Sequence, residues 1–167
     1  MTYLNVNIKG LNGRPHAALQ NVSHTSQVKK LHAHVKFLCK DLYTFETRAL
    51  YTGDSAACRL CLGSFDPSEQ PTENTSHLLT TCNAFSDIRA RIFLQYEIVC
   101  AAKFNFRSIL DDSDLMTQFI LDCTSLNLPF RILETDEICS RVFSLSRDLC
   151  FYIMKRRLCL LTDMDAA

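Results

Sequence analysis

Hydrophobic residues recur every three or four positions in four segments of the chain. This spacing puts them on one side of a helix and predicts four amphipathic helices. The first follows Ser26, a favourable N-cap, and the second covers residues 83–102. The third is short and can be capped by Asp112 or Ser113, and the fourth is long and covers residues 136–161, capped by its first residue. The apolar positions are Val28, Leu31, Val35, Leu38 and Leu42 in the first helix, Phe85, Ile88, Ile92, Tyr96 and Val99 in the second, Leu115, Phe119 and Leu121 in the third, and Ile138, Val142, Leu145, Leu149, Tyr152 and Ile153 in the fourth.

The segment between the first two helices lacks this period and contains glycine and proline turns. The residues before the first helix are also turn-rich and predict a loosely ordered arm with a short strand at Tyr3–Ile8. We therefore expect a mainly α protein, a small helical bundle with a turn-rich segment inserted after its first helix. The expected parts are an arm (1–27), a basic helix and linker (28–50), the turn-rich segment (51–83), a helical region (84–162) and a tail (163–167).

Four residues of the turn-rich segment have the spacing of a metal site. Two residues separate Cys58 from Cys61, and four separate His77 from Cys82. Two thiolates in a tight turn and a His–Cys pair at the start of a helix can bind one tetrahedral Zn²⁺ ion. The pattern therefore predicts a Cys-Cys-His-Cys zinc knuckle. Because four protein ligands leave no open position, this zinc would be structural and not catalytic.

The other cysteines suggest no second function. An odd total of nine, at irregular spacings, argues against a disulfide framework. Five of them lie in apolar runs and are expected to be buried as small hydrophobic residues. These are Cys39, Cys100, Cys123, Cys150 and Cys159.

The formal net charge of zero conceals an uneven distribution. Residues 1–60 carry eight basic and three acidic residues, a net charge of +5, and residues 61–167 carry ten basic and fifteen acidic residues, a net charge of −5. A basic front half is compatible with a polyanionic partner. Tyr43 or Tyr51 could stack on unpaired bases. The candidate nucleic-acid contacts are Lys29, Lys30, Lys36, Lys40, Arg48, Arg59, Arg89 and Arg91.

The residues around the knuckle resemble a known family. The runs Cys58-Arg-Leu-Cys61, His77-Leu-Leu-Thr-Thr-Cys82 and Phe85-Ser-Asp-Ile-Arg89 are similar to the zinc-binding segment near the C-terminus of non-long-terminal-repeat (LINE-type) retrotransposon proteins. The resemblance covers roughly residues 28–157, and the fifteen residues between Cys61 and His77 make a longer loop than is usual in that family. Since members carry reverse transcriptase and endonuclease domains upstream, the resemblance implies the C-terminal part of a retroelement protein.

The leading hypothesis is a non-catalytic, zinc-stabilised nucleic-acid-binding module that contacts template RNA or target DNA. Its partners would be RNA or single-stranded or target DNA, bound weakly and in a salt-sensitive way, and also a reverse transcriptase or a second copy of the chain. The alternatives are a zinc-shaped docking or oligomerisation module that uses the apolar face from Ile138 to Ile153, and an inert retroelement relic.

The sequence carries no complete set of catalytic motifs, so we expect no enzymatic activity and no catalytic residues. Asp111-Asp112 lies at a predicted helix start and is interpreted as a cap, not as a polymerase pair. His32 and His34 are two residues apart, do not share a helical face, and are expected at the surface. We see neither a membrane-spanning run nor a signal peptide and expect an intracellular protein, nuclear or cytoplasmic and not secreted.

Overall fold

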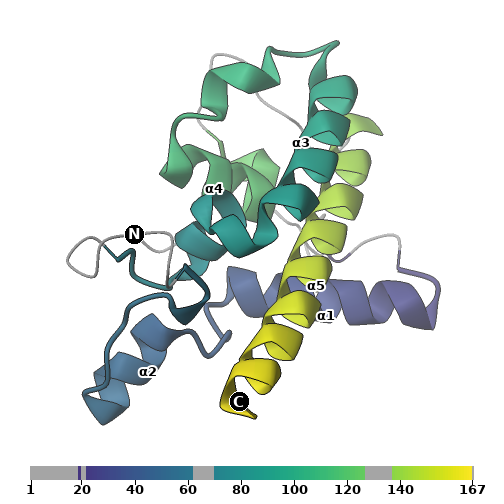
Figure 1. Cartoon of the computed structure of the whole chain (residues 1–167). Helices are drawn as coiled ribbons and strands as arrows, with labels where there is room; N and C mark the ends of the chain where they lie inside the picture. Colours follow the sequence, from purple (N-terminus) through teal and green to yellow (C-terminus); the bar gives the residue numbers. More distant parts are fainter. Residues whose placement is uncertain (1–18, 20–21, 62–69, 127–136, 167) are drawn as a thin grey trace.

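The structure, a computed structural model, describes residues 19, 22–61, 70–126 and 137–166 and is mainly helical, as the sequence predicts (Figure 1). The predicted strand at Tyr3–Ile8 and the cap at Asp136 lie outside these residues. No helix in the described part of the chain is long and apolar enough to cross a membrane. The α-helices are α1 (Thr25–Leu38), α2 (Phe45–Thr52), α3 (Ser86–Cys100), α4 (Ser113–Asp122) and α5 (Glu137–Asp165). The short elements are the 3₁₀ turns η3 (Arg59–Cys61), η5 (Asn83–Phe85), η6 (Phe106–Ile109) and η7 (Cys123–Ser125), and one turn of π-helix, η4 (His77–Thr81).

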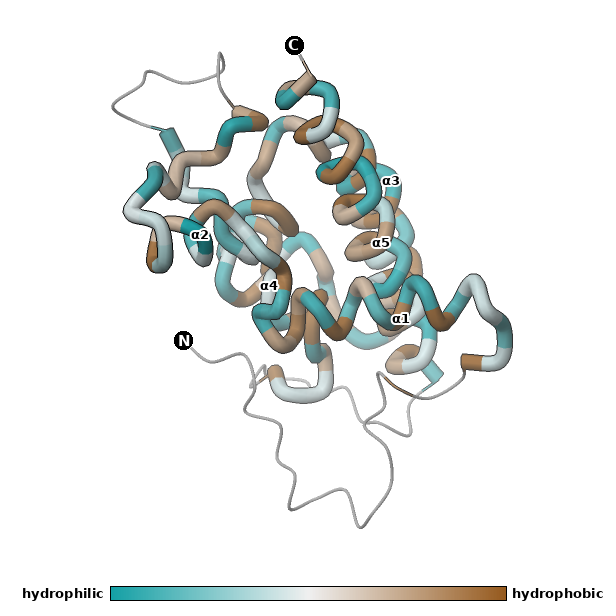
Figure 2. Tube along the Cα trace, turned by 90° about the horizontal axis from the view of Figure 1, so that it is seen from below, coloured by the Kyte–Doolittle hydropathy of each residue, from teal (hydrophilic) through white to brown (hydrophobic). Residues whose placement is uncertain are grey.

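Helix α5 is the centre of the fold. It packs against α1, which crosses it, and against α3, which runs beside it (Figure 1). Brown and teal residues alternate along α1 and α5 in Figure 2, as expected for helices with one side in the core. Val142, Leu149 and Ile153 of α5 are completely buried. The part of the Ile138–Ile153 face that these three residues form is therefore core and is not available for docking, whereas Ile138, Leu145 and Tyr152 are only partly buried.

The predicted apolar side of α3 is confirmed, since all five of its positions are buried. Tyr96 is the largest of the fully buried side chains, and its ring lies 5.1 Å from that of Phe119 and 5.4 Å from that of Phe106. Its hydroxyl is 2.8 Å from Ser146 Oγ on α5, so the one polar atom of this side chain is satisfied inside the core. Asp112 caps α4 as predicted, its carboxylate accepting from the Leu115 backbone N–H at 2.9 Å.

The buried side of α1 differs from the prediction. Val28 is 53% exposed, whereas His34 and Phe37 are completely buried. His34 Nε2 lies 3.1 Å from the carbonyl oxygen of Leu121, in the last turn of α4, where helical carbonyls have no partner within their own helix. This hydrogen bond makes the histidine a core residue, so the prediction of a surface His34 is wrong.

The predicted linker after α1 contains a helix that the periodicity did not reveal. Thr44 caps α2 by accepting from the Thr47 backbone N–H at 3.2 Å. Gly53 ends α2 with a φ of 72°, a left-handed conformation that glycine adopts at little cost. At the other end of the chain α5 continues to Asp165, into the residues predicted as a tail.

Candidate metal centre

The four predicted ligands meet in one buried cluster. Cys58, Cys61 and Cys82 are completely buried, His77 is 7% exposed, and the four ligand atoms all lie within 4.8 Å of one another. Cys82 Sγ is 3.6 Å from Cys61 Sγ and 3.9 Å from Cys58 Sγ. Cys61 Sγ is 3.5 Å from His77 Nε2. A tetrahedral ion about 2.3 Å from sulfur and about 2.0 Å from nitrogen requires S···S distances of about 3.8 Å and N···S distances of about 3.5 Å. The cluster has these dimensions and could hold a metal ion.

Short local structures bring each pair of ligands together. In η3 the Cys61 backbone N–H donates to the Cys58 carbonyl at 3.1 Å, which folds the first two thiols into one turn. In η4 the Cys82 N–H donates to the His77 carbonyl at 2.8 Å. This bond spans five residues, the π-helical pattern, and places His77 and Cys82 one above the other. Asn74 starts the turn, since its side-chain oxygen accepts from the His77 backbone N–H at 2.8 Å.

Thr81 fixes the orientation of the imidazole. His77 Nε2 faces the thiols, and its Nδ1 lies 2.9 Å from Thr81 Oγ1. When Nε2 binds a metal, Nδ1 carries the hydrogen and donates it to this hydroxyl, the usual arrangement for a metal-binding histidine. Thr81 is therefore a positioning residue of the centre.

Burial and mutual contact raise the pKa of two of the thiols, Cys58 and Cys61. The hydrogen bond between Cys58 and Cys82, together with burial, raises the pKa of Cys58 to about 12. Burial also raises the pKa of Cys61. A divalent cation stabilises the thiolates and must displace these protons on binding. A bound divalent cation would therefore take the place of the protons on these sulfur atoms.

Three charged side chains are buried around the cluster. Glu73 is completely buried, Arg157 is 6% exposed and Arg89 is 7% exposed. Glu73 Oε1 accepts from Arg157 Nη2 at 2.6 Å, and Glu73 Oε2 lies 4.0 Å from Cys58 Sγ. Three thiolates and one carboxylate carry four negative charges, which a divalent cation and two guanidinium groups neutralise. The buried charges thus fit a divalent metal.

Arg89 contributes to this neutrality, and it forms no ion pair with a carboxylate among the residues that the structure describes. Burial lowers the pKa of its guanidinium, while the charges of Cys82 and Cys61 act in the opposite direction. Its Nη1 has no hydrogen-bond partner among the residues that the structure describes. An unsatisfied buried guanidinium is costly unless negative charge lies nearby, which a metal–thiolate centre with three cysteines supplies. Arg89 is one of the predicted nucleic-acid contacts, and its burial makes that prediction wrong.

This placement yields a testable expectation. Replacing Arg89 by Gln should lower the affinity for a divalent metal by about tenfold, as is usual for partners in the outer shell of a metal site. Replacing it by Lys should retain most of the affinity, because the positive charge is kept. Competition with a coloured chelator measures both constants, and circular dichroism checks that both variants stay helical. Equal affinity of the Gln variant and the unchanged protein would show that Arg89 does not interact with the metal.

The remaining candidate nucleic-acid contacts fall into distinct groups. Three of them are paired with carboxylates: Lys30 with Asp148 at 2.7 Å, Arg48 with Asp54 at 2.9 Å and Arg59 with Asp165 at 3.4 Å. Lys40 is exposed in the turn after α1. Lys29, Lys36 and Arg91 form no ion pair within the described ranges and are at least partly exposed. Tyr43 and Tyr51 are 58% and 80% exposed.

The other cysteines differ in their exposure to solvent. Cys100, Cys123 and Cys150 are buried as predicted, and burial raises the pKa of Cys100 to about 12. Cys39 and Cys159 are exposed, so their prediction as buried residues is wrong. Cys39 lies beyond the last residue of α1, and Cys159 lies on the outer side of α5. Apolar neighbours in the sequence do not determine which side of a helix a residue occupies.

A comparison with protein-family models finds no family that matches this chain, and comparisons with curated proteins and with solved structures find no match either.

Proposed function

We propose that the buried cluster binds zinc and that the protein is a zinc-stabilised, non-catalytic nucleic-acid-binding module. Three thiolates and one imidazole at tetrahedral distances form a typical structural zinc site, and four protein ligands leave no position for a substrate. The resemblance of the knuckle to LINE-type retrotransposon proteins supports the same function. On this proposal the module holds template RNA or target DNA for such an element.

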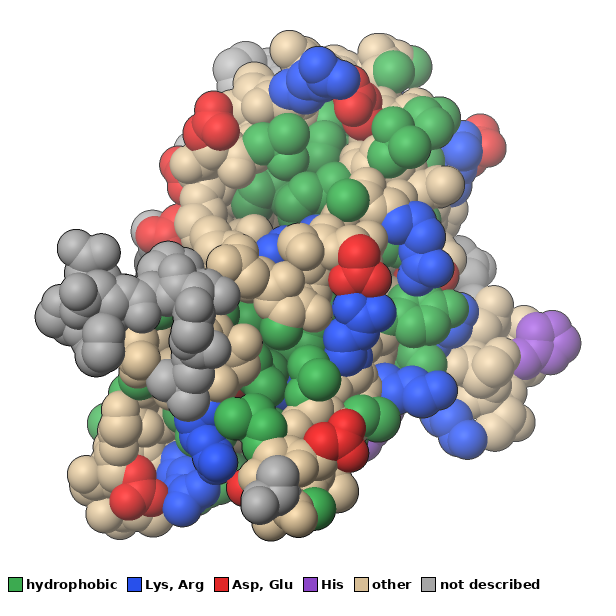
Figure 3. Space-filling view, viewed as in Figure 1, with side chains coloured by type: hydrophobic (Ala, Val, Ile, Leu, Met, Phe, Trp, Pro, Cys, Tyr) green, Lys and Arg blue, Asp and Glu red, His purple; other side chains and the backbone are tan. Residues whose placement is uncertain are grey.

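The observation that carries the proposal is the set of cations that no carboxylate neutralises. Lys29 and Lys36 of α1 and Arg91 of α3 have no ion-pair partner in the described part of the chain. Figure 3 shows Lys and Arg side chains gathered on the face where α5 crosses α1. Such cations contact phosphates irrespective of sequence, which gives weak and salt-dependent binding.

The proposal predicts roughly micromolar binding of a single-stranded oligonucleotide at about 50 mM salt, weakening steeply as salt is added. A Lys29→Gln/Lys36→Gln variant should bind more weakly at every salt concentration. The slope of log affinity against log salt should fall by up to about 0.7 for each lost contact with a single strand. Fluorescence anisotropy of a labelled strand measures this slope.

The matched control is Arg107→Gln/Arg141→Gln, which removes the same charge at exposed positions outside α1. Arg107 is paired with Glu97 at 2.8 Å, and Arg141 lies on the outer side of α5. The control should leave the slope nearly unchanged. Equal slopes for the two double variants would contradict a contact through α1, and no binding by the folded, zinc-loaded protein would contradict the function.

One observation favours protein docking as a second candidate. Leu50 and Tyr51 at the end of α2 are 79% and 80% exposed, and Leu94 and Ile98 of α3 are 57% and 62% exposed. Large apolar side chains at such exposures suit an interface with another protein. A docking module would associate with little dependence on salt, so the same salt titration distinguishes the two candidates.

A further inference from the structure

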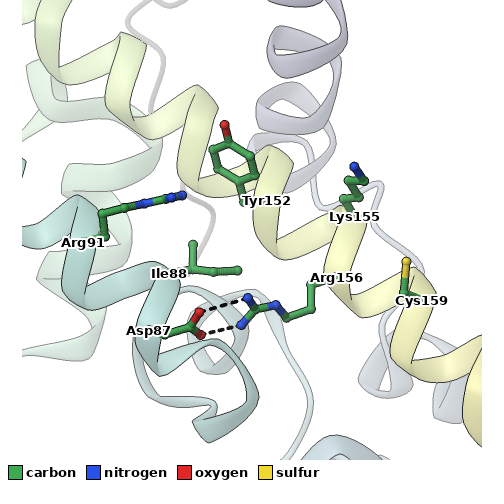
Figure 4. Close-up of a pocket in the computed structure, with 7 residues that line it drawn as sticks. All are labelled: Asp87, Ile88, Arg91, Tyr152, Lys155, Arg156 and Cys159. Carbon is green, nitrogen blue, oxygen red and sulfur yellow. Dashed lines mark hydrogen bonds and ion pairs between the residues drawn. The ribbon is translucent and has the colours of Figure 1, made fainter.

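A groove between α3 and α5 lies apart from the metal centre and has features that neither the zinc site nor the core explains. Its volume is about 480 Å³, within the range of small-molecule sites. Ile88 forms an apolar part of its lining, and Arg91, Tyr152, Lys155 and Cys159 line the rest together with an Asp87–Arg156 pair (Figure 4). From this combination we propose that the groove binds one nucleotide unit, with its phosphate on Arg91 and Lys155 and its base against Tyr152 and Ile88. The inference deepens the proposed function and rests on it.

The helical period explains how these side chains converge. On α3, Asp87, Ile88 and Arg91 lie within one turn, and on α5, Tyr152, Lys155 and Arg156 do the same, so each helix contributes one wall. Cys159 follows Lys155 by four residues and extends the wall of α5.

The groove has two cations that are available to an anion. Arg156 donates to both carboxylate oxygens of Asp87, through Nη2 at 2.9 Å to Oδ2 and through Nη1 to Oδ1. This pairing lowers the pKa of Asp87 and neutralises the acidic group of the groove. Arg91 and Lys155 are exposed, and neither forms an ion pair with any described residue. A phosphate entering the groove therefore meets two unneutralised positive charges.

The aromatic ring gives the groove its selectivity for a nucleotide over a simple anion. The guanidinium carbon of Arg91 lies 5.1 Å from the centroid of the Tyr152 ring, within the range of a cation–π contact. This contact holds Arg91 over the groove and leaves the ring only partly buried. A flat base can stack on a tyrosine ring or a guanidinium plane, and the phosphate attached to it then lies within reach of the cations.

Two exposed cysteines make the inference directly testable in the zinc-loaded full chain. Cys159 lines the groove, and Cys39 follows α1 beside Lys40. The rate of alkylation of each by iodoacetamide can be followed by peptide mass spectrometry, with and without ligand. The probes are a ten-nucleotide deoxythymidine strand, thymidine monophosphate and inorganic phosphate. A ligand in the groove should slow the alkylation of Cys159 at least threefold, whereas binding of the strand along α1 should slow the alkylation of Cys39.

The variant Arg91→Gln/Lys155→Gln should lose the protection of Cys159, and the control Arg107→Gln/Arg141→Gln should keep it. Each ligand effect is taken as a ratio within one variant, because removing Lys155 also changes the intrinsic reactivity of Cys159. Protection by thymidine monophosphate and by the strand, but not by phosphate alone at the same concentration, is the result expected. Protection by the mononucleotide alone would identify a free nucleotide as the ligand.

Different results of this experiment contradict the groove inference and the proposed function. If the strand binds by anisotropy and slows Cys39 but not Cys159, the groove inference is overturned and the function stands. If neither the strand nor the mononucleotide slows Cys159, the inference is overturned whatever the anisotropy shows. If the mononucleotide slows Cys159 while no strand binds, the groove is retained and the strand-binding function is rejected.

Discussion

Removing zinc with a strong chelator should abolish the cooperative thermal unfolding of this protein and most of its helical circular dichroism. The ligands are held in the core, since Leu78 and Leu79 of the π turn and Phe85 after Cys82 are all completely buried. Structural zinc contributes on the order of 10 kcal/mol or more to folding, which is comparable with the whole stability of a domain, about 5–15 kcal/mol. Without the ion, no metal bonds join the Cys58–Cys61 pair to the His77–Cys82 pair.

A pair of single replacements separates the metal from ordinary packing. Cys61→Ser should behave like the chelated protein, because it removes a ligand. Cys150→Ala also removes a completely buried thiol but should cost only about 1–2 kcal/mol of packing. Calorimetry with and without chelator measures both. If the chelated protein and the Cys61→Ser variant melt at the temperature of the unchanged protein, the cluster does not stabilise the fold.

Replacing Glu73 by Gln should destabilise the protein by about 3–5 kcal/mol, the usual cost of leaving one partner of a buried ion pair alone. Glu73 Oε1 accepts from the Phe45 backbone N–H at 3.0 Å as well as from Arg157, and Arg157 also donates to the Tyr43 carbonyl at 3.1 Å. The pair thus ties α5 to the start of α2 and to the segment that carries the ligands. Loss of the ion pair should therefore weaken the packing of α5, the start of α2 and this segment against one another.

The control for this effect is Arg107→Gln, which breaks an ion pair whose arginine side chain is 70% exposed. Exposed pairs contribute about 0–1 kcal/mol, so this variant should unfold almost like the parent protein. Urea unfolding at saturating zinc gives both free energies and keeps metal affinity out of the comparison. Equal midpoints for the Glu73 and Arg107 variants would mean that the buried pair does not support the fold.

The sequence predicts the helices and the Cys-Cys-His-Cys cluster better than it predicts which polar residues are buried. The period of three and four identifies the buried side of α3, and the Cys and His spacings identify a cluster that is close in space, because both signals are local. The burial of His34 depends on the carbonyl of Leu121, far away in the sequence. No local pattern contains that information.

The same limit applies to charge. Arg89 is predicted from the sequence as a surface cation, yet it is buried beside the Cys-Cys-His-Cys cluster, and so is Arg157. Glu73 is one acidic residue in a turn-rich segment. It forms an ion pair only because the fold places Arg157 of α5 beside it. Conversely, the α3–α5 groove joins Arg91 to Lys155, which are 64 positions apart in the sequence (155 − 91). Contacts between distant segments decide which charges are neutralised, and therefore which can bind a ligand.

X-ray absorption at the zinc edge of the purified, zinc-loaded protein tests the metal centre most directly. We expect one zinc per chain, with three sulfur ligands at about 2.3 Å and one nitrogen ligand at about 2.0 Å. The His77→Ala variant should either lose the metal or bind it with another atom in place of the imidazole nitrogen. The Cys159→Ser variant should leave the spectrum unchanged. A shell of oxygen and nitrogen atoms, or a shell with fewer than three sulfurs, would contradict the assignment of Cys58, Cys61, His77 and Cys82 as the zinc ligands.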